Sequence, residues 1–284
     1  MTFKSIFPVK KSKEEIQFYI ENGPKFGNIL YSLYKKIRDG ELIYPEKIIM
    51  EYETMCNKEF KNHYTFYPFK IATNNENQFF GESICISVNE VAAHGNTKKR
   101  FEEGDVVSID CGLAVSMDVF KPHSITPLNI KYLHFDAAFT TEIGPKQNWI
   151  RAPWSALKMV AIGQPKNTYE LAAIIENICE IDELSNVISL TGHGIGYNLH
   201  EPPIIHNAKG DYLREELFEG LCFCAEPVFA KRKKKKKLIE RTYIDSDGWA
   251  ISTQSGSPTS HFETMFCKHE GKIIDLLGVT KWSL

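Results

Sequence analysis

Residues 106–115 read Val-Val-Ser-Ile-Asp-Cys-Gly-Leu-Ala-Val, and one charged residue, Asp110, stands inside this apolar run rich in β-branched residues. The run predicts a β-strand. A carboxylate buried in such a strand costs several kcal/mol or more unless it is paired or binds a cation. Three more acids have similar surroundings: Asp136 in Leu-His-Phe-Asp-Ala-Ala-Phe, Glu226 in Cys-Phe-Cys-Ala-Glu-Pro-Val-Phe, and Glu263 in His-Phe-Glu-Thr-Met-Phe. Any one of them could face solvent, but four without an obvious run of buried arginines favour a metal site.

A glycine-flanked histidine accompanies the acids. Gly192-His193-Gly194-Ile195-Gly196 precedes His200-Glu201-Pro202-Pro203, and the flanking glycines leave room beside the His193 imidazole for a ligand. The alternative is a glycine-rich turn with two incidental histidines. Four carboxylates and one imidazole balance the charge of two divalent ions, and oxygen-rich ligation suits Mn, Fe, Co or Mg. Two ions roughly 3.5–4 Å apart also need bridging carboxylates.

The order of predicted elements along the chain, helices, then strands, a helix and more strands, predicts an α+β fold with a mainly antiparallel sheet. Ser12 and Glu15 form a capping box for a first helix, which we expect to stop at Gly23-Pro24. The other expected helices are residues 26–40, a segment starting at Pro45, and residues 168–180. The expected strands are 84–88, 106–115, 133–143, 187–190, 221–225, 238–243, 249–253 and 261–267. No linker divides the chain, so residues 1–284 are expected to form one domain, preceded by an N-terminal extension at 1–11.

The composition is that of a globular protein. The chain has 284 residues, 43% of them hydrophobic, and a net charge of −2, which gives no general case for binding nucleic acid or membranes. Seven cysteines without a CxxC pair make a disulfide framework or a zinc module improbable. With no signal-peptide core and no membrane-length apolar run, we expect a cytoplasmic protein. A basic run at Lys231–Lys237 predicts a solvated loop; the alternative is a contact with ribosomal RNA.

Asp110, Asp136, His193, Glu226 and Glu263, in this order and these contexts, resemble the metal ligands of the methionine aminopeptidases and their pita-bread relatives. The segment Ser-Val-Asn-Glu-Val-Ala-Ala-His-Gly at 87–95 is similar to a family motif as well. The resemblance implies the pita-bread fold, an antiparallel sheet covered by helices, in the short, bacterial-like type I form. It also implies a single catalytic domain that acts as a monomer.

The implied activity is removal of the initiator methionine from nascent polypeptide N-termini by a hydroxide bridging two divalent ions, Co, Mn, Fe or Zn. Asp110 would chelate one ion, His193 and Glu226 the other, and Asp136 and Glu263 would bridge. His94 and His200 would contact substrate near the scissile bond, and Glu226 would also shuttle a proton. Cys85 and Trp249 match the lining of the methionine pocket, although ordinary core packing explains both equally well.

The chain departs from the family pattern in several places. Asp110 and Asp136 are 26 positions apart, which indicates an inserted loop near 117–131 and makes Asp118 a rival for the second aspartate. Asp136 is preferred because it has the family's spacing to Thr140 and Gly144. Other departures are His261 and Thr264 beside the last glutamate, Leu199 before His200, and residues 69–80 in place of a shorter segment.

Two other functions remain possible at this level. One is a peptidase of the same fold that cleaves before proline, although such enzymes usually carry Arg where Ser260 and His261 stand. The other is a non-catalytic ribosome- or RNA-binding protein of this fold; such proteins typically lose ligands, whereas all five are present here.

Overall fold

The computed structural model describes residues 7–61, 64–66, 82–117, 132–233 and 238–284. Helical segments are α1 (Lys13–Arg38), α2 (Pro45–Phe60), η2 (Asn148–Arg151), α3 (Ala152–Gly163), α4 (Thr168–Ile181) and η3 (Val279–Lys281). Strands are β1 (Tyr64–Phe66), β2 (Cys85–Val88), β3 (Val91–Ala93), β4 (Val106–Ser116), β5 (Tyr132–Glu142), β6 (Ser185–Asn186), β7 (Gly192–Gly194), β8 (Glu201–Ile205), β9 (Cys222–Ala225), β10 (Val228–Ala230), β11 (Thr242–Ile244), β12 (Ile251–Thr253), β13 (Thr259–His261), β14 (Thr264–His269) and β15 (Lys272–Asp275).

Helix α1 begins where the sequence predicts but does not stop where expected. The Ser12 and Glu15 capping box is formed, and the helix then runs through Pro24 to Arg38 without a break. Proline removes one backbone hydrogen bond from a helix interior, but packing on both sides of it offsets that loss here. The burial of Phe18, Tyr19, Phe26 and Leu30 along one stripe provides this packing, so the expected interruption at Gly23-Pro24 is wrong.

The glycines near Pro24 serve close packing rather than a turn. A Cβ atom at Gly23 would lie 2.2 Å from the carbonyl oxygen of Leu276, and one at Gly27 would lie 2.0 Å from that of Leu277. Because no side chain fits at either position, α1 lies directly against the backbone near the end of the chain. Helix α1 also packs on β5, where the ring centroids of Tyr19 and Phe135 are 5.1 Å apart.

Strand β4 is the centre of a four-stranded antiparallel sheet in which β1, β2 and β5 all pair with it. The β4–β5 ladder is long, extending from Val106 opposite Glu142 to Ser116 opposite Tyr132. A second antiparallel sheet has the order β15-β14-β9-β7-β8, and two three-stranded sheets have the orders β13-β10-β6 and β11-β12-β3. The hydrogen bond from Glu263 N to Ala138 O, 2.9 Å long, joins the two larger sheets.

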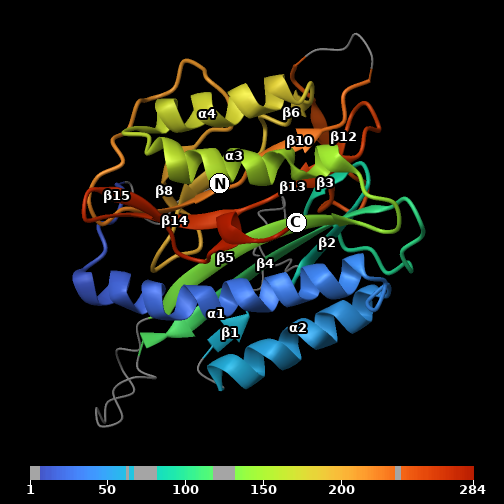
Figure 1. Ribbon diagram of the computed structural model, residues 1–284, viewed down its shortest axis with the longest axis horizontal. Helices are drawn as coiled ribbons and strands as arrows, with labels where there is room; N and C mark the ends of the chain where they lie inside the picture. Colours follow the sequence, from blue (N-terminus) through green and yellow to red (C-terminus); the bar gives the residue numbers. More distant parts are fainter. Residues whose placement is uncertain (1–6, 62–63, 67–81, 118–131, 234–237) are drawn as a thin grey trace.

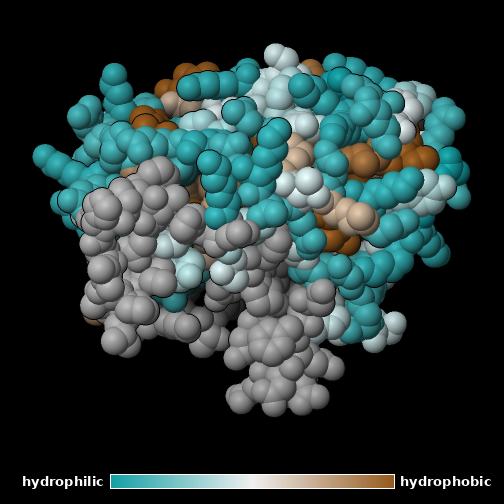
Figure 2. All heavy atoms as spheres, turned by 90° about the horizontal axis from the view of Figure 1, so that it is seen from below, coloured by the Kyte–Doolittle hydropathy of each residue, from teal (hydrophilic) through white to brown (hydrophobic). Residues whose placement is uncertain are grey.

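Helices cover the strands on two sides. Figure 1 shows α1 and α2 below the strands and α3 and α4 above them. Seen from below, the described residues present a mostly hydrophilic face with small, scattered hydrophobic patches (Figure 2). No helix among the described residues is long and apolar enough to cross a membrane. The predicted architecture, α+β with antiparallel sheets covered by helices, is confirmed.

Besides α1, several other elements differ from the sequence-based prediction. Helix α3 was not predicted, since its sequence Ala-Pro-Trp-Ser-Ala-Leu-Lys-Met-Val-Ala-Ile-Gly is apolar over most of its circumference and lacks a clear polar face. Strands β7 and β8 occupy the stretch that could be read as a glycine-rich turn. The strand expected at 187–190 is wrong: the strand there is β6, Ser185–Asn186, and Val187 already begins a turn.

Candidate metal centre

Two of the predicted ligands lie side by side on the β4–β5 hairpin. Asp110 is opposite Ala138 and Asp136 is opposite Gly112 in the antiparallel register. Side chains two positions apart on a strand point to the same face, so Asp110 and Asp136 are diagonal neighbours on one face of the sheet. The longer spacing between them in the sequence is therefore accommodated outside the ladder. The rival Asp118 and the rest of the expected insertion, 118–131, lie outside the described residues.

The two glutamates occupy the end of the β9–β14 ladder. Ala225 pairs with Thr264, so Glu226 follows the last residue of β9 and Glu263 precedes the first residue of β14. Glu263 is bonded through its backbone to Ala138 of β5, next to the carboxylates of the hairpin. The meeting of the two sheets therefore brings four acids together.

His193 reaches the same place from β7, and its glycine neighbours have a different role from the one expected. A Cβ atom at Gly192 would lie 2.2 Å from the carbonyl oxygen of Cys224, and one at Gly194 would lie 2.1 Å from that of Pro202. The glycines allow the backbones of β9 and β8 to approach, so they pack strands closely instead of leaving room for a ligand. That reading of the glycines was wrong, although His193 still faces the acids.

The orientation of His193 follows from one hydrogen bond. Its Nδ1 lies 2.9 Å from the carbonyl oxygen of Gly194, which can only accept, so Nδ1 carries the proton. The unprotonated Nε2 lies 3.7 Å from Asp136 Oδ2 and 3.6 Å from Glu226 Oε1. Burial lowers the pKa of His193 to about 4, so the ring is neutral near pH 7 and presents a lone pair to the carboxylates.

The four acids strongly disfavour carrying their charges without a cation. Burial raises the pKa of Asp110 to about 7. Burial and then the charges of neighbouring acids raise the pKa values of Asp136, Glu226 and Glu263 as well. Among the described residues none of the four forms an ion pair with Lys or Arg. Asp136 Oδ1 and Glu263 Oε1 are buried without a hydrogen-bond partner in the described part of the chain. The donor set and these two oxygens fit a divalent cation.

His94 and His200 stand beside this cluster. The rings of His193 and His200 meet edge to face with centroids 4.4 Å apart. His94 follows β3 with a left-handed backbone angle, φ of 55°. Burial, reinforced by His193 and His94, lowers the pKa of His200 to about 2, and burial also lowers the pKa of His94. Both are therefore neutral near pH 7.

Cys85 and Trp249, the two candidates for the methionine pocket, occupy different surroundings. Cys85 is fully buried on β2 directly opposite Asp110. Burial and then the charges of Asp110 and Asp136 raise the pKa of its thiol. Trp249 is partly buried in the turn between β11 and β12. Residues 69–80, which replace a shorter family segment and leave part of the specificity pocket unassigned, lie outside the described residues.

Two residues at the centre were not assigned a role from the sequence. Cys224 lies with Asp136, His193 and Glu263 in one group of potential ligands. His261, noted only as a departure from the family pattern, places Nε2 3.9 Å from Glu226 Oε2. The signal for Cys224 was its spacing, since residues two apart on a strand share a face and Cys224 precedes Glu226 by two.

The segment before α1 also contacts the centre's surroundings. Lys11 is buried and its Nζ lies 2.7 Å from Glu201 Oε2, next to His200. A Cβ atom at Gly196 would lie 1.9 Å from Lys11 Cε, so Gly196 makes room for this lysine. The N-terminal extension expected at 1–11, of which 7–11 are described, thus ends in a residue packed into the body of the protein.

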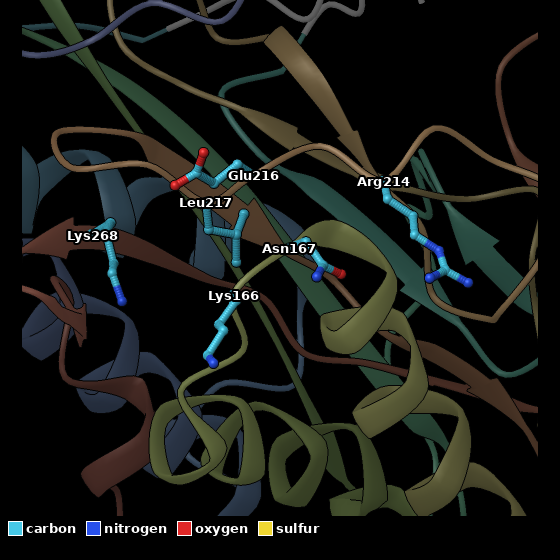
Figure 3. Close-up of a pocket in the computed structure, with 6 residues that line it drawn as sticks. All are labelled: Lys166, Asn167, Arg214, Glu216, Leu217 and Lys268. Carbon is cyan, nitrogen blue, oxygen red and sulfur yellow. The ribbon is translucent and has the colours of Figure 1, made fainter.

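Two further features lie apart from the acids. In the basic run, Arg232 donates a 2.6 Å hydrogen bond to Leu184 O and Lys233 donates to Ser255 O; residues 234–237 lie outside the described residues. A surface hollow of about 450 Å³ lies near the start of α4. It is lined by the six residues drawn in Figure 3: Lys166, Asn167, Arg214, Glu216, Leu217 and Lys268. Lys268 is five residues beyond Glu263, roughly 16 Å at the rise of a strand, so the hollow is separate from the metal centre.

Comparisons with known proteins agree with this geometry. Residues 34–256 match metallopeptidase family M24. A methionine aminopeptidase of Mycoplasma capricolum is 30% identical over 265 residues, covering 89% of this chain and 91% of the relative. The crystal structure of a methionine aminopeptidase from Rickettsia prowazekii has a TM-score of 0.74 at 20% identity, covering 95% of this chain and all of that one. A prolidase from Thermococcus sibiricus has a TM-score of 0.59 at 17% identity, covering 95% and 60%. The two structures show the shared pita-bread fold.

Proposed function

Because this chain belongs to metallopeptidase family M24, we propose that it is a methionine aminopeptidase, which removes the initiator methionine from nascent polypeptides. The observation that carries the proposal is the convergence of four acids, two of them buried and two half-buried, and one neutral imidazole where two sheets meet. The similarity to a methionine aminopeptidase over nearly the whole chain supports this activity over others of the same fold.

The family is one of metallopeptidases, and divalent metal is its cofactor. We assign Asp110, Asp136, His193, Glu226 and Glu263 as the residues that hold it. Four carboxylates match the charge of two divalent ions, which Co, Mn, Fe or Zn can supply. When bound, such ions make water a stronger nucleophile near pH 7 and polarise the peptide carbonyl.

The surrounding side chains have roles that their environment supports. The side chain of Glu226 is 14% exposed and is more accessible than those of His193 and Asp136, which lie beside it. Glu226 can therefore pass a proton between the site and the leaving amine. His94 and His200 are neutral and can hydrogen-bond the carbonyl oxygen and the amide of the scissile bond. Cys85 and Trp249 are assigned to the side-chain pocket for methionine.

Substrate assays separate this activity from the alternatives. The metal-loaded protein is expected to cleave Met-Ala-Ser and to leave Ala-Pro peptides intact, whereas a chelated control and His94→Ala should lose most of the activity, about 100-fold or more. Cleavage of Ala-Pro alone would favour the prolidase-like reading. No cleavage with any divalent metal would favour a non-catalytic binding protein.

The cellular setting follows from this substrate. We place the protein in the cytoplasm, where nascent chains emerge, acting as a monomer. If Lys231–Lys237 contacts ribosomal RNA, the affinity of the protein for ribosomes should fall steeply as the salt concentration rises. Changing Lys233–Lys237 to Gln should then reduce co-sedimentation with ribosomes at low salt, and unchanged co-sedimentation would rule the contact out.

A further inference from the structure

Cys224 lies within reach of the same ion as the proposed ligands. Its Sγ, one oxygen each of Asp136 and Glu263, and one ring nitrogen of His193 all lie within 4.8 Å of one another, and all four residues are buried. Ligands at 2.0–2.3 Å from a zinc-like ion in a tetrahedral shell lie roughly 3.3–3.8 Å from each other. The four atoms therefore lie close enough to reach one ion after side-chain shifts of about 1 Å.

The strand register explains why the thiol points to the acids. Cys224 and Glu226 are two residues apart, so they share a face of β9. Cys224 pairs with Met265 on β14, and Glu263, two residues before Met265, is its diagonal neighbour on that face. The close approach of β7 to Cys224, which Gly192 permits, brings His193 to the same position. The arrangement is fixed by three paired strands.

A second observation favours a cation within this group. Asp136 Oδ1 and Glu263 Oε1 are buried and have no hydrogen-bond partner among the described residues. The alternative role for Cys224 is that of a neutral thiol that donates a hydrogen bond to Glu263. One S–H can satisfy one acceptor at most, so a neutral thiol would leave at least one of these oxygens without a partner. A cation shared by the group would satisfy both.

We infer that Cys224 is a thiolate ligand of the ion held by His193, Asp136 and Glu263. On binding, the thiol proton leaves to solvent and a sulfur–metal bond forms, with no change of oxidation state. A thiolate favours softer ions, so this centre should prefer Zn²⁺, Co²⁺ or Cd²⁺ over Mn²⁺ or Mg²⁺ more strongly than a centre with only oxygen and imidazole ligands. The inference rests on the proposed function for the presence of a metal centre.

Cobalt provides a direct test. The metal-free protein is titrated anaerobically with Co²⁺, and both the visible bands of bound cobalt and the near-ultraviolet sulfur-to-cobalt charge-transfer band are recorded. We expect the charge-transfer band in the wild type and its complete loss in Cys224→Ser. Cys85→Ser is the matched control because Cys85 is also a buried thiol beside Asp110, and it should retain the band.

A cadmium titration of the wild type needs no variant and guards against misfolding of Cys224→Ser. We expect a sulfur-to-cadmium band at stoichiometric Cd²⁺, and in the folded variant an affinity for Cd²⁺ about tenfold lower with less than about threefold change for Mn²⁺. Visible cobalt bands without any charge-transfer band, or a band that survives in Cys224→Ser, would overturn the inference. In that case cleavage of Met-Ala-Ser would still stand, whereas failure of both metal binding and cleavage would remove the proposed function too.

Discussion

At the scale of single residues, a substitution of Glu263 should affect metal affinity and the stability of the metal-free protein in opposite directions. Glu263 is buried beside other acids, and its pKa is raised by burial and by Glu226 and Asp110. Glu263→Gln should lower metal affinity by at least about 10–100-fold and abolish cleavage. Because it removes one of several like charges, it should raise the free energy of unfolding of the metal-free protein.

Isothermal titration with Mn²⁺ or Co²⁺ and urea unfolding of the metal-free protein measure the two effects. Glu216→Gln, at the separate surface hollow, is the control and should change neither quantity. Unchanged metal affinity in Glu263→Gln would show that this carboxylate is not a ligand.

The candidate ligands could be proposed from the sequence, whereas the roles of the residues next to them, Gly192 and Cys224, could not. Embedded acids identified Asp110, Asp136, Glu226 and Glu263, because charge inside an apolar strand can be recognised without coordinates. The structure brings them together with His193, but their coordination of an ion stays a prediction. The role of Gly192 depends on the backbone of β9, which is 32 residues away in the chain and carries no local signal. Cys224 was missed because a cysteine in a strand is usually ordinary core.

At the scale of elements, α1 shows how packing overrides local propensity. Gly23 and Pro24 predict a break, yet the helix continues because its glycines contact the backbone of Leu276 and Leu277. Helix ends that have their own chemistry, such as the Ser12 cap, were predicted correctly. The continuation of the helix through Pro24 could not be predicted, because it depends on packing partners 250 or more positions later in the chain.

Gly27 tests this explanation of α1. Gly27→Ala places a methyl group 2.0 Å from the Leu277 oxygen, so it should lower the free energy of unfolding by about 1–3 kcal/mol although alanine is the better helix former. Asn28→Ala, at the exposed neighbouring position, should be neutral or slightly stabilising. Chemical denaturation of both variants measures the difference. A Gly27→Ala variant as stable as Asn28→Ala would mean that α1 is not held against this backbone.

A buried ion pair helps to attach the N-terminal segment, alongside backbone contacts of Lys10 and Lys11 with residues 220 and 221. Lys11→Met leaves Glu201 buried without its cation and should cost about 3–5 kcal/mol of stability. Adding Glu201→Gln should recover much of the loss, because it removes the charge and keeps an oxygen for the amide of Asn198. Urea unfolding of the single and double variants gives the coupling energy. Strictly additive losses would contradict a direct interaction.

At the scale of the whole molecule, the centre joins two sheets. Asp110 and Asp136 belong to the four-stranded sheet, whereas His193, Glu226 and Glu263 belong to or flank the five-stranded one. A metal ion held by these residues would crosslink parts of the chain up to 153 positions apart. Binding to the folded state alone adds stability that grows with metal concentration. In the metal-free protein the neighbouring carboxylates instead lower the stability of the folded state, because their negative charges repel one another.

The burial of Asp110 gives the metal-free protein a distinctive pH dependence. Burial raises the pKa of Asp110 from 3.8 to about 7, so the folded state keeps a proton that the unfolded state loses between about pH 4 and 7. The contribution of Asp110 to stability is therefore fully present below about pH 4 and is lost as pH rises through 7.

Asp110→Asn removes that titration while the buried histidines, whose lowered pKa values act in the opposite direction, stay in both proteins. The stability of Asp110→Asn minus that of the wild type should hence grow as pH rises from 4 to 7, with both proteins metal-free. Urea unfolding in a chelating buffer at several pH values measures it. A difference that is flat across this range would show that Asp110 ionises normally in the metal-free protein, and that burial does not raise its pKa.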